Sequence, residues 1–559
     1  MIPTIAPPSL REFLLLSPSI LLGLWGLIVL VVDLSILRKS PGPARARSLG
    51  SLSLLGVALA FGSMFAVGSS GVGTGQEELL FQGTLLGGPL IDRITELLLI
   101  LLAMVIGLSM ALDFTEYWGE YYALLLWSAV GMILLASSEE LLTLFLTLEL
   151  MTIALYLITA FEKNRKRSAE AGLKYFIYGS VSSALFLFGL SLIYGLTGST
   201  RLETIGLLLR NGDQAAGLGN NVAGFVAVLL ILVGFGFKIA AVPFHQWAPD
   251  VYEGAPAPVA AWIATGSKIA SFIALLKVFV QALGPWASQP VELTSPGWIS
   301  IIALIAALTM TYGNFAALGQ KNLKRMLAYS SIAHSGYMLV GVLACVVAQD
   351  GKAAGTVLFY LFIYSFSNIG AFALAVWLVR DKGTDEINDL NGLAARWPIL
   401  AVSILLLMLS LIGMPVLAGF WGKLYMFMEA INRSDKNNRL TFLWLVALGL
   451  MNSVVSAFYY VRVLRAMFLR APSGEPLSNP PFAVRFSILV STAIVLVFSV
   501  FPTPLVDESM KLADSRSFSI GGVKGFRSSV YAGPPIKDKL RLPAGPSLQL
   551  VPQPKATAK

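Results

Sequence analysis

The sequence predicts an all-α membrane protein, a polytopic bundle of about 14 transmembrane helices. Its composition is 56% hydrophobic and only 13% charged, whereas soluble domains carry about 25% charged residues. Apolar runs of about 18 residues or more recur along the chain, and each is long enough to cross roughly 30 Å of hydrocarbon. The length would suit several soluble domains, but these runs favour one membrane domain followed by a polar tail.

The apolar runs set the expected spans in order. We expect membrane helices at residues 19–37, 48–68, 94–112, 119–136, 140–161, 169–196, 222–248, 256–283, 298–318, 324–348, 354–380, 397–430, 440–469 and 483–502. The residues from Lys511 onward are rich in Pro, Gly, Ser and Lys and lack an apolar period, which predicts a disordered or partner-bound extension.

Two of these spans are interrupted. The seventh, GFGFKIAAVPFHQWAPD, contains Pro243, and the twelfth, LSLIGMPVLAGFWGKLYMF, contains Gly413, Pro415 and Gly419. Proline removes a backbone hydrogen bond, and freed backbone at membrane depth is tolerated only against protein or a wet cavity. A simple kink would explain either break. Two breaks five spans apart, each near a lysine, favour repeats that are inverted because five is odd, an arrangement typical of ion transporters.

Basic residues indicate the orientation. Loops after odd-numbered spans hold more Lys and Arg than loops after even-numbered spans, for example in the segments LRKSPGPARAR and EKNRKRS. The positive-inside rule places the basic loops in the cytoplasm and both termini on the outer face. The first residues, MIPTIAPPSLREF, lack the basic start and early apolar core of a signal peptide.

Charged side chains inside the spans are the candidate functional residues. A Lys or Glu near the bilayer centre costs at least about 2.5–3.5 kcal/mol, so it persists where it faces the protein interior and has a function there. Glu149 and Lys268 lie mid-span, Lys238 precedes the break at Pro243, and Lys423 lies in the outer half of the broken twelfth span. The other candidates are Lys174, Lys324, His334 and His245.

Each lysine has an alternative explanation, because a long side chain can carry its ammonium to the membrane interface. This snorkelling is a strong alternative for Lys277 and Lys324, a plausible one for Lys174 and a weak one for the three deeper lysines. The side chain of Glu149 is too short for it. Each histidine could equally be an ordinary core residue.

The candidate residues favour protons over sodium as the transported ion. Burial lowers the pKa of a lysine toward neutral and a nearby carboxylate raises it again, so movement of a neighbouring charge can load or unload the site. Sodium would need a cage of oxygen ligands, and an ammonium repels a metal ion. The sequence therefore predicts a water-bridged proton path of Lys, Glu and His side chains.

The chain offers few ligands for a redox centre. Its one cysteine, Cys345, cannot close an intrachain disulfide or hold an iron–sulfur cluster. The two histidines could ligate a haem, although in an apolar chain they more often serve packing or proton transfer. We expect no cofactor and no metal in this chain. The net charge of +9 lies mostly in short loops that set orientation, so no nucleic-acid partner is expected.

Several stretches resemble the N subunit of bacterial NADH:quinone oxidoreductase, complex I. They are LELMTIALYLITAF, RSAEAGLKYFIYGSVSSALFLFG, FKIAAVPFHQWAPDVYEGAPAPVAAWIATGSKIA, NLKRMLAYSSIAHSGY and GMPVLAGFWGKLYMF, which extend the resemblance from about residue 90 to about residue 470. The family are antiporter-like subunits with two inverted five-helix repeats and a polar axis at mid-membrane. The resemblance divides the chain into N-terminal helices (1–90), two repeat regions (91–283 and 284–470), a last transmembrane helix (471–510) and a polar extension (511–559).

The resemblance also assigns roles. Glu149 matches the fifth-helix glutamate, Lys238 the lysine of the first broken helix that pairs with it, Lys268 the eighth-helix lysine linking two half-channels, and Lys423 the lysine of the second broken helix. The four other candidates fall on family positions whose roles are open. NAD, flavin, iron–sulfur clusters and quinone are expected in partner subunits of the membrane and peripheral arms, and the complex in the bacterial inner membrane with both termini periplasmic.

Other functions remain open at this point. Cation/proton antiporters and membrane hydrogenases use similar subunits, although GFWGKLYMF favours the N type, because the M type carries glutamate where this segment has lysine. A third alternative is a scaffold that only anchors its neighbours. The tail after about residue 505 is longer than the family pattern implies.

Overall fold

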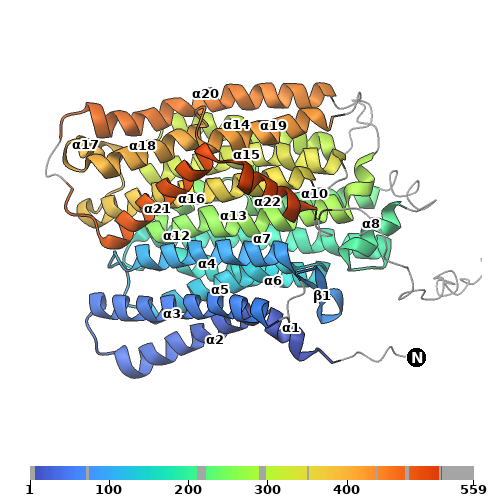
Figure 1. The fold of residues 1–559 in the computed structure, drawn as a ribbon, viewed down its shortest axis with the longest axis horizontal. Coiled ribbons are helices and arrows are strands. Elements are labelled where there is room, and N and C mark those ends of the chain that lie inside the picture. Colours follow the sequence, from blue (N-terminus) through green and yellow to red (C-terminus); the bar gives the residue numbers. More distant parts are fainter. Residues whose placement is uncertain are drawn as a thin grey trace, which may run out of the picture. The chain divides into compact units, whose positions relative to one another are not determined.

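The computed structural model describes residues 7–70, 75–210, 222–288, 298–348, 352–434, 439–472, 477–514 and 518. Long helices lie side by side along one common direction (Figure 1). The strands in this described part form one short antiparallel hairpin, so the predicted all-α bundle is confirmed.

The N-terminal part lies at one side of the bundle and is mostly peripheral (Figure 1). Its elements are α1 (Leu10–Leu15), α2 (Ser17–Val32) continued by η1 (Asp33–Leu37), α3 (Gly42–Ser69), β1 (Glu78–Leu80), η2 (Phe81–Gly83), β2 (Leu85–Gly87) and α4 (Pro89–Ser109). The helices match the first three predicted spans, and the hairpin was not predicted.

The first set of five spans follows. Its elements are α5 (Trp118–Ser137), α6 (Leu141–Thr159), α7 (Lys166–Thr197), the short α8 (Leu202–Arg210), the broken pair α10 (Val222–Lys238) and α11 (Trp247–Gly254), and a composite span of α12 (Ala257–Trp262), η3 (Ile263–Ser267), α13 (Lys268–Leu276) and η4 (Lys277–Ala282), then η5 (Gly284–Ser288). The composite span is completely buried within the bundle. Its stretches η3 and η4 are π-helical, a geometry that is frequent at functional sites.

The second set of five spans repeats this order of elements. It contains α14 (Trp298–Leu318), α15 (Leu323–Ala348), α16 (Lys352–Lys382), η6 (Ile387–Leu390), α17 (Leu393–Arg396), the broken pair α18 (Pro398–Ile412) and α19 (Ala418–Asn432), and α20 (Arg439–Leu469). The last span, α21 (Phe482–Val500), precedes α22 (Thr503–Ala513). The fourth span is the broken one in each set of five.

The number of spans agrees with the prediction. Among the described residues, 11 helices are long and apolar enough to cross a membrane, and the shorter apolar helices α10 and α18 are the first halves of the broken spans. Together with α4 they account for every predicted span.

Both predicted breaks are present in the structure. Helix α10 ends at Lys238, and Ala240 follows with a φ of 56°. Helix α18 ends at Ile412, followed by Gly413 at φ 84° and Val416 at φ 79°. Left-handed backbone cannot continue an α-helix, so the carbonyl groups before each break are left for other donors.

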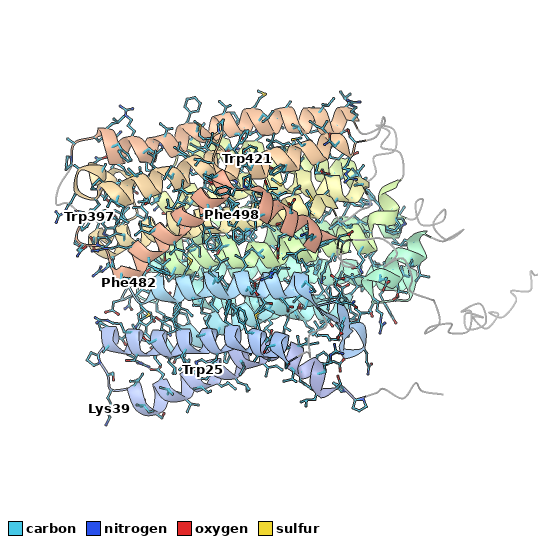
Figure 2. All side chains as sticks on the ribbon, in the orientation of Figure 1. Trp25, Lys39, Trp397, Trp421, Phe482 and Phe498 are labelled. Atoms are coloured by element: carbon cyan, nitrogen blue, oxygen red, sulfur yellow. The ribbon has the colours of Figure 1, made fainter. Side chains whose placement is uncertain are left out.

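Hydrogen bonds involving side chains join the second break to α21. In Figure 2, Trp421 lies near Phe498, and Trp421 Nε1 donates to the carbonyl of Ser499 at 3.2 Å. The hydroxyl of Ser499 in turn accepts from the backbone N–H of Ala418 at 2.8 Å. The hydroxyl of Ser499 thus satisfies the first free N–H group of α19, which the break would otherwise leave unpaired.

Candidate functional site

The candidate site begins where α10 and α6 meet. The ammonium of Lys238 donates to Thr152 Oγ1 at 2.5 Å, and Thr152 stands three residues after Glu149, which places both on one face of α6. Glu149 accepts a hydrogen bond from Ser183 on α7 at 2.5 Å. Glu149 acts electrostatically on Lys238, but no ion pair within 4 Å joins them in the described structure. Direct pairing of the two side chains therefore stays a prediction.

Lys268 lies next along the chain of polar groups and is 3% exposed. Its ammonium donates to the carbonyl and the hydroxyl of Ser331, each at 2.6 Å, and to Ser335 Oγ at 2.8 Å. These three acceptors match the three protons of an ammonium. Because all three are neutral oxygens, Lys268 differs from the ion-paired lysines elsewhere in the structure.

A serine at the first helix break connects Lys268 with the backbone next to Lys238. The hydroxyl of Ser335, which accepts from Lys268, lies 2.6 Å from the carbonyl oxygen of Ile239 and can donate to it. Ile239 directly follows Lys238 at the end of α10. The hydroxyl of Ser335 thus joins the Lys268 ammonium to the backbone directly after Lys238.

Aromatic hydroxyls of α16 continue the series of polar groups toward the second break. Tyr364 donates to Ser331 Oγ at 2.9 Å, and the ring of His334 lies 5.1 Å from the ring of Tyr364 between centroids. His334 Nδ1 lies 2.5 Å from the hydroxyl of Tyr360. His334 is buried and lies close enough to Lys268 and Lys423 to feel both charges.

Lys423 ends the chain at the second break. Its ammonium donates to the carbonyl of Ile412 at 2.9 Å and to Ser453 Oγ at 3.2 Å. Ile412 is the last residue of α18, so the break itself provides the acceptor. The ammonium also lies 4.5 Å from the ring centroid of Tyr337, a favourable cation–π position.

Comparison with known proteins assigns the chain to a family. A family profile described as "NADH:quinone oxidoreductase/Mrp antiporter, TM" matches residues 138–454, more than half of the chain. The chain belongs to this antiporter-like family.

Individual relatives agree with this assignment. An NADH-quinone oxidoreductase subunit N from Desulfitobacterium hafniense is 41% identical over 414 residues, covering 72% of this chain and 79% of the relative. A chain of respiratory complex I from Thermus thermophilus is 32% identical with a TM-score of 0.69, covering 88% and 98%. A chain of the Mrp complex from Dietzia sp. DQ12-45-1b is similar in fold, with 17% identity, a TM-score of 0.74 and coverage of 90% and 97%.

Two lysines of this antiporter-like chain do not snorkel. Lys324 is 1% exposed; it donates to the carbonyls of Glu253 and Ala255 at 2.8 and 2.9 Å and pairs with Asp385 at 3.3 Å. It therefore stabilises the turn between α11 and α12. Lys277 is fully buried and pairs with Glu139 at 2.8 Å.

Lys174 belongs to a partly exposed charge network. It pairs with Glu170 at 2.6 Å and with Asp250 at 2.7 Å, and Arg325 pairs with Asp250 at 2.7 Å and with Glu253 at 2.9 Å. Burial alone would raise the pKa of the Asp250 carboxyl, but the hydrogen bonds from Lys174 and Arg325 outweigh burial and lower it. The network fixes α11 against α7 and α15, outside the chain of polar groups described above.

His245 lies within the first break. It is buried, and its ring packs edge-on against Tyr312 at 4.5 Å between centroids. Of the eight candidates, Glu149, Lys238, Lys268, His334 and Lys423 follow one another along the chain of polar groups. The other three, Lys174, Lys324 and His245, hold neighbouring parts of the bundle.

The sequence analysis did not identify the neutral residues in the series of polar groups. Thr152, Ser331, Ser335 and Tyr360 carry no charge, and hydroxyl groups are common in membrane helices, so none of them stood out. One signal was present, because Ser331 and Ser335 lie four residues apart around His334 in SSIAHSGY. In the described part of the chain, no group of three or more His, Cys, Asp or Glu side chains is placed to hold a metal ion.

Proposed function

We propose that this chain is the proton-translocating N subunit of a complex I-type NADH:quinone oxidoreductase, which couples electron transfer in other subunits to proton movement. One observation carries the proposal: lysines and hydroxyls follow one another from α6 to α19 through a buried interior. Buried ionisable groups in membrane spans mark ion paths and proton relays.

The arrangement suggests how charge movement is transmitted. A lysine that gains or loses a proton changes the electrostatic energy of its neighbours, and such an interaction is stronger in a protein interior than in water. Lys268, like Lys238 and Lys423, donates only to neutral acceptors, so no hydrogen-bonded carboxylate fixes its charge. In our proposal Lys268 exchanges charge states with Lys238 on one side and, through His334, with Lys423 on the other.

The expected partners supply electron transfer, which the candidate residues of this chain cannot perform. Lysine, glutamate and histidine carry protons but accept no electrons, so NAD, flavin, iron–sulfur clusters and quinone belong to partner subunits of the membrane and peripheral arms in this proposal. The names of the relatives support such partners. The excess of Lys and Arg in alternate loops supports a bacterial inner-membrane subunit with both termini periplasmic.

The test uses the assembled complex in sealed vesicles, with electron transfer and acidification measured together. Lys238→Ala removes the ionisable group, and Lys238→Arg keeps a charge that is not lost at any useful pH. We expect both variants to assemble and to impair coupled proton transfer, while Lys166→Ala, at an exposed position of α7, behaves like the wild type. Normal turnover with a normal gradient in both Lys238 variants would refute the role and favour a scaffold.

The second candidate is a subunit of a cation/proton antiporter. The family description names both the oxidoreductase and the Mrp antiporter, and the Mrp chain shares the fold. The buried lysines argue against a sodium path, because an ammonium repels a metal ion. Purification separates the two proposals, since a redox complex brings flavin and iron–sulfur subunits with this chain and an antiporter does not.

A further inference from the structure

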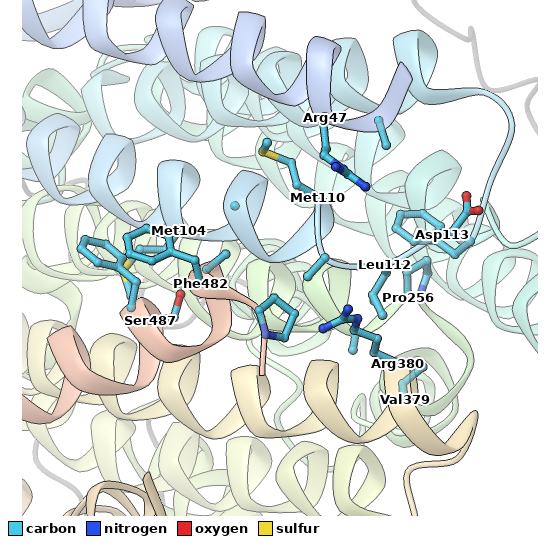
Figure 3. A pocket seen from close by; sticks show the side chains of 18 of the residues that line it. Arg47, Met104, Met110, Leu112, Asp113, Pro256, Val379, Arg380, Phe482 and Ser487 are labelled. Atoms are coloured by element: carbon cyan, nitrogen blue, oxygen red, sulfur yellow. The ribbon is translucent and has the colours of Figure 1, made fainter. Parts of the chain in front are cut away.

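A large cavity lies outside the chain of polar groups. It has a volume of about 1280 Å³ and is walled by α3, α4, α12, α16 and α21 (Figure 3). Small-molecule pockets usually measure about 300–1,000 Å³, so this cavity is roomy enough for a larger ligand. None of the five residues of the proton path lines it.

One end of the cavity is positively charged. Arg47 of α3 and Arg380 of α16 extend from opposite walls toward the space between them (Figure 3). The other basic lining residues are already engaged, Arg165 with Glu162 and Lys324 with Asp385. Arg47 and Arg380 form no ion pair within the described ranges, and Asp113 is the one remaining acidic group of the lining. The uncommitted charge at this end is therefore positive.

The other end of the cavity is apolar. The α4 wall runs from Gly107 to Ile100, about 10 Å at 1.5 Å per residue. Ile100, Phe482 and Phe486 line the cavity and are also 41%, 80% and 48% exposed. Because these exposed apolar side chains are on membrane helices, the cavity opens sideways at the apolar surface of the chain.

We propose that this cavity binds one anionic phospholipid, with its phosphate between Arg47 and Arg380 and its acyl chains along α4 and α21. Arginine binds phosphate through paired N–H donors, and basic pockets between transmembrane helices are typical binding sites for anionic lipid headgroups. The apolar wall argues for a lipid over a free phosphate, which would gain nothing from it.

The position of the site gives the lipid a structural consequence. Pro256 and Ala257, at the start of α12, line the cavity together with Lys324. Lys324 holds the carbonyls of Glu253 and Ala255 in the turn between α11 and α12. The lipid therefore packs against the turn that joins the broken helix to the span carrying Lys268.

The test uses the intact complex in phosphatidylcholine nanodiscs doped with a photoreactive phosphatidylglycerol. The test variant is Arg47→Gln with Arg380→Gln. The control variant is Arg38→Gln with Arg396→Gln. Both arginines are exposed and neither lines the cavity, and their neighbours Lys39 and Trp397 are both at the left end of the bundle in Figure 2. At about fivefold per arginine, we expect lipid binding about 30-fold weaker in the test variant and unchanged in the control.

A second variant probes the apolar end. A side chain at Gly107 points into the cavity region with only Ala483 within 4 Å, at 3.5 Å, so Gly107→Leu fills space without touching the arginines. We expect it to reduce lipid labelling while the complex assembles, which keeps the proposal testable where the arginine variant fails to fold.

Competition distinguishes the possible occupants. Labelling of α3, α4 or α21 peptides that excess phosphatidylglycerol suppresses, and that phosphatidylcholine or glycerol phosphate does not, supports the proposal. Equal competition by glycerol phosphate would show a free-phosphate site, and crosslinks from this cavity to a neighbouring subunit in place of lipid would show a protein interface. Either result, or unchanged labelling in both cavity variants, would overturn the proposal.

Discussion

Replacement of Thr152 by valine tests the proposed proton path at its least obvious member. Thr152 Oγ1 accepts from Lys238 at 2.5 Å and itself donates to the carbonyl of Leu148 at 2.5 Å. Valine has nearly the same shape but no hydroxyl, so Thr152→Val leaves the buried ammonium without this acceptor. The packing of α6 against its neighbours changes little.

The size of the effect follows from the bond that is lost. A hydrogen bond to a charged group contributes about 1.5–3 kcal/mol, and 1.36 kcal/mol corresponds to a tenfold change in an equilibrium. Thr152→Val therefore reduces the population of charged Lys238 about 10- to 150-fold relative to its neutral form. If charging of Lys238 is part of each turnover, coupled proton transfer falls by one to two orders of magnitude.

The assay measures electron transfer and acidification together in sealed vesicles carrying the assembled complex. Thr152→Ser keeps the hydroxyl and should retain most activity. Thr159→Val is the matched control, because Thr159 is a buried threonine of the same helix whose hydroxyl donates to the carbonyl of Leu155. Equal turnover and equal gradients in Thr152→Val and Thr159→Val would refute the assigned role of the Thr152 hydroxyl.

Three further predictions follow from other parts of the structure. Arg45→Ala removes the ion-pair partner of the fully buried Asp33 and should destabilise the protein by about 3–5 kcal/mol; an unchanged melting temperature of the complex would contradict this. The lowered pKa of Asp250 gives stability that is present above its ordinary value and lost as the pH falls through the lower folded value, so the melting temperature of Asp250→Asn should depend less on pH in that acidic range than that of the wild type. A cysteine introduced after Lys511 should react with an impermeant thiol reagent from the periplasmic side, where the buried Cys345 does not interfere; labelling only in inverted vesicles would reverse the proposed orientation.

Much of the fold could be predicted because the membrane restricts the choices. A chain that crosses hydrocarbon must satisfy its own backbone, so each apolar run has to be helical, and breaks fall where proline and glycine interrupt a run. The elements that were missed are short and lie between spans. They include the β1–β2 hairpin, α8 and α22, whose apolar residues are too few to show a period. The π-helical turns before Lys268 and at Lys277 were also missed, since no side-chain pattern marks them.

The candidate site was predictable only in its charged members. A buried charge is costly in a membrane and therefore stands out in the sequence, as Lys238, Lys268 and Lys423 did. Partners that lie far apart in sequence gave no such signal. Glu139 lies at a helix end, where an acid is unremarkable, yet it pairs with Lys277 in a fully buried position.

The two helix breaks explain why the proposed proton path lies where it does. A break leaves carbonyl groups without backbone donors, and at membrane depth such groups need other donors. At the second break Lys423 donates directly to the freed carbonyl of Ile412. At the first, Ser335 lies within hydrogen-bonding distance of the carbonyl of Ile239 while accepting from Lys268. The second break thus supplies a neutral oxygen that holds the buried ammonium of Lys423 directly, and the first break holds the ammonium of Lys268 through the hydroxyl of Ser335. A carboxylate in the same place would fix the charge, whereas a carbonyl dipole leaves it free to respond to the next lysine along the path.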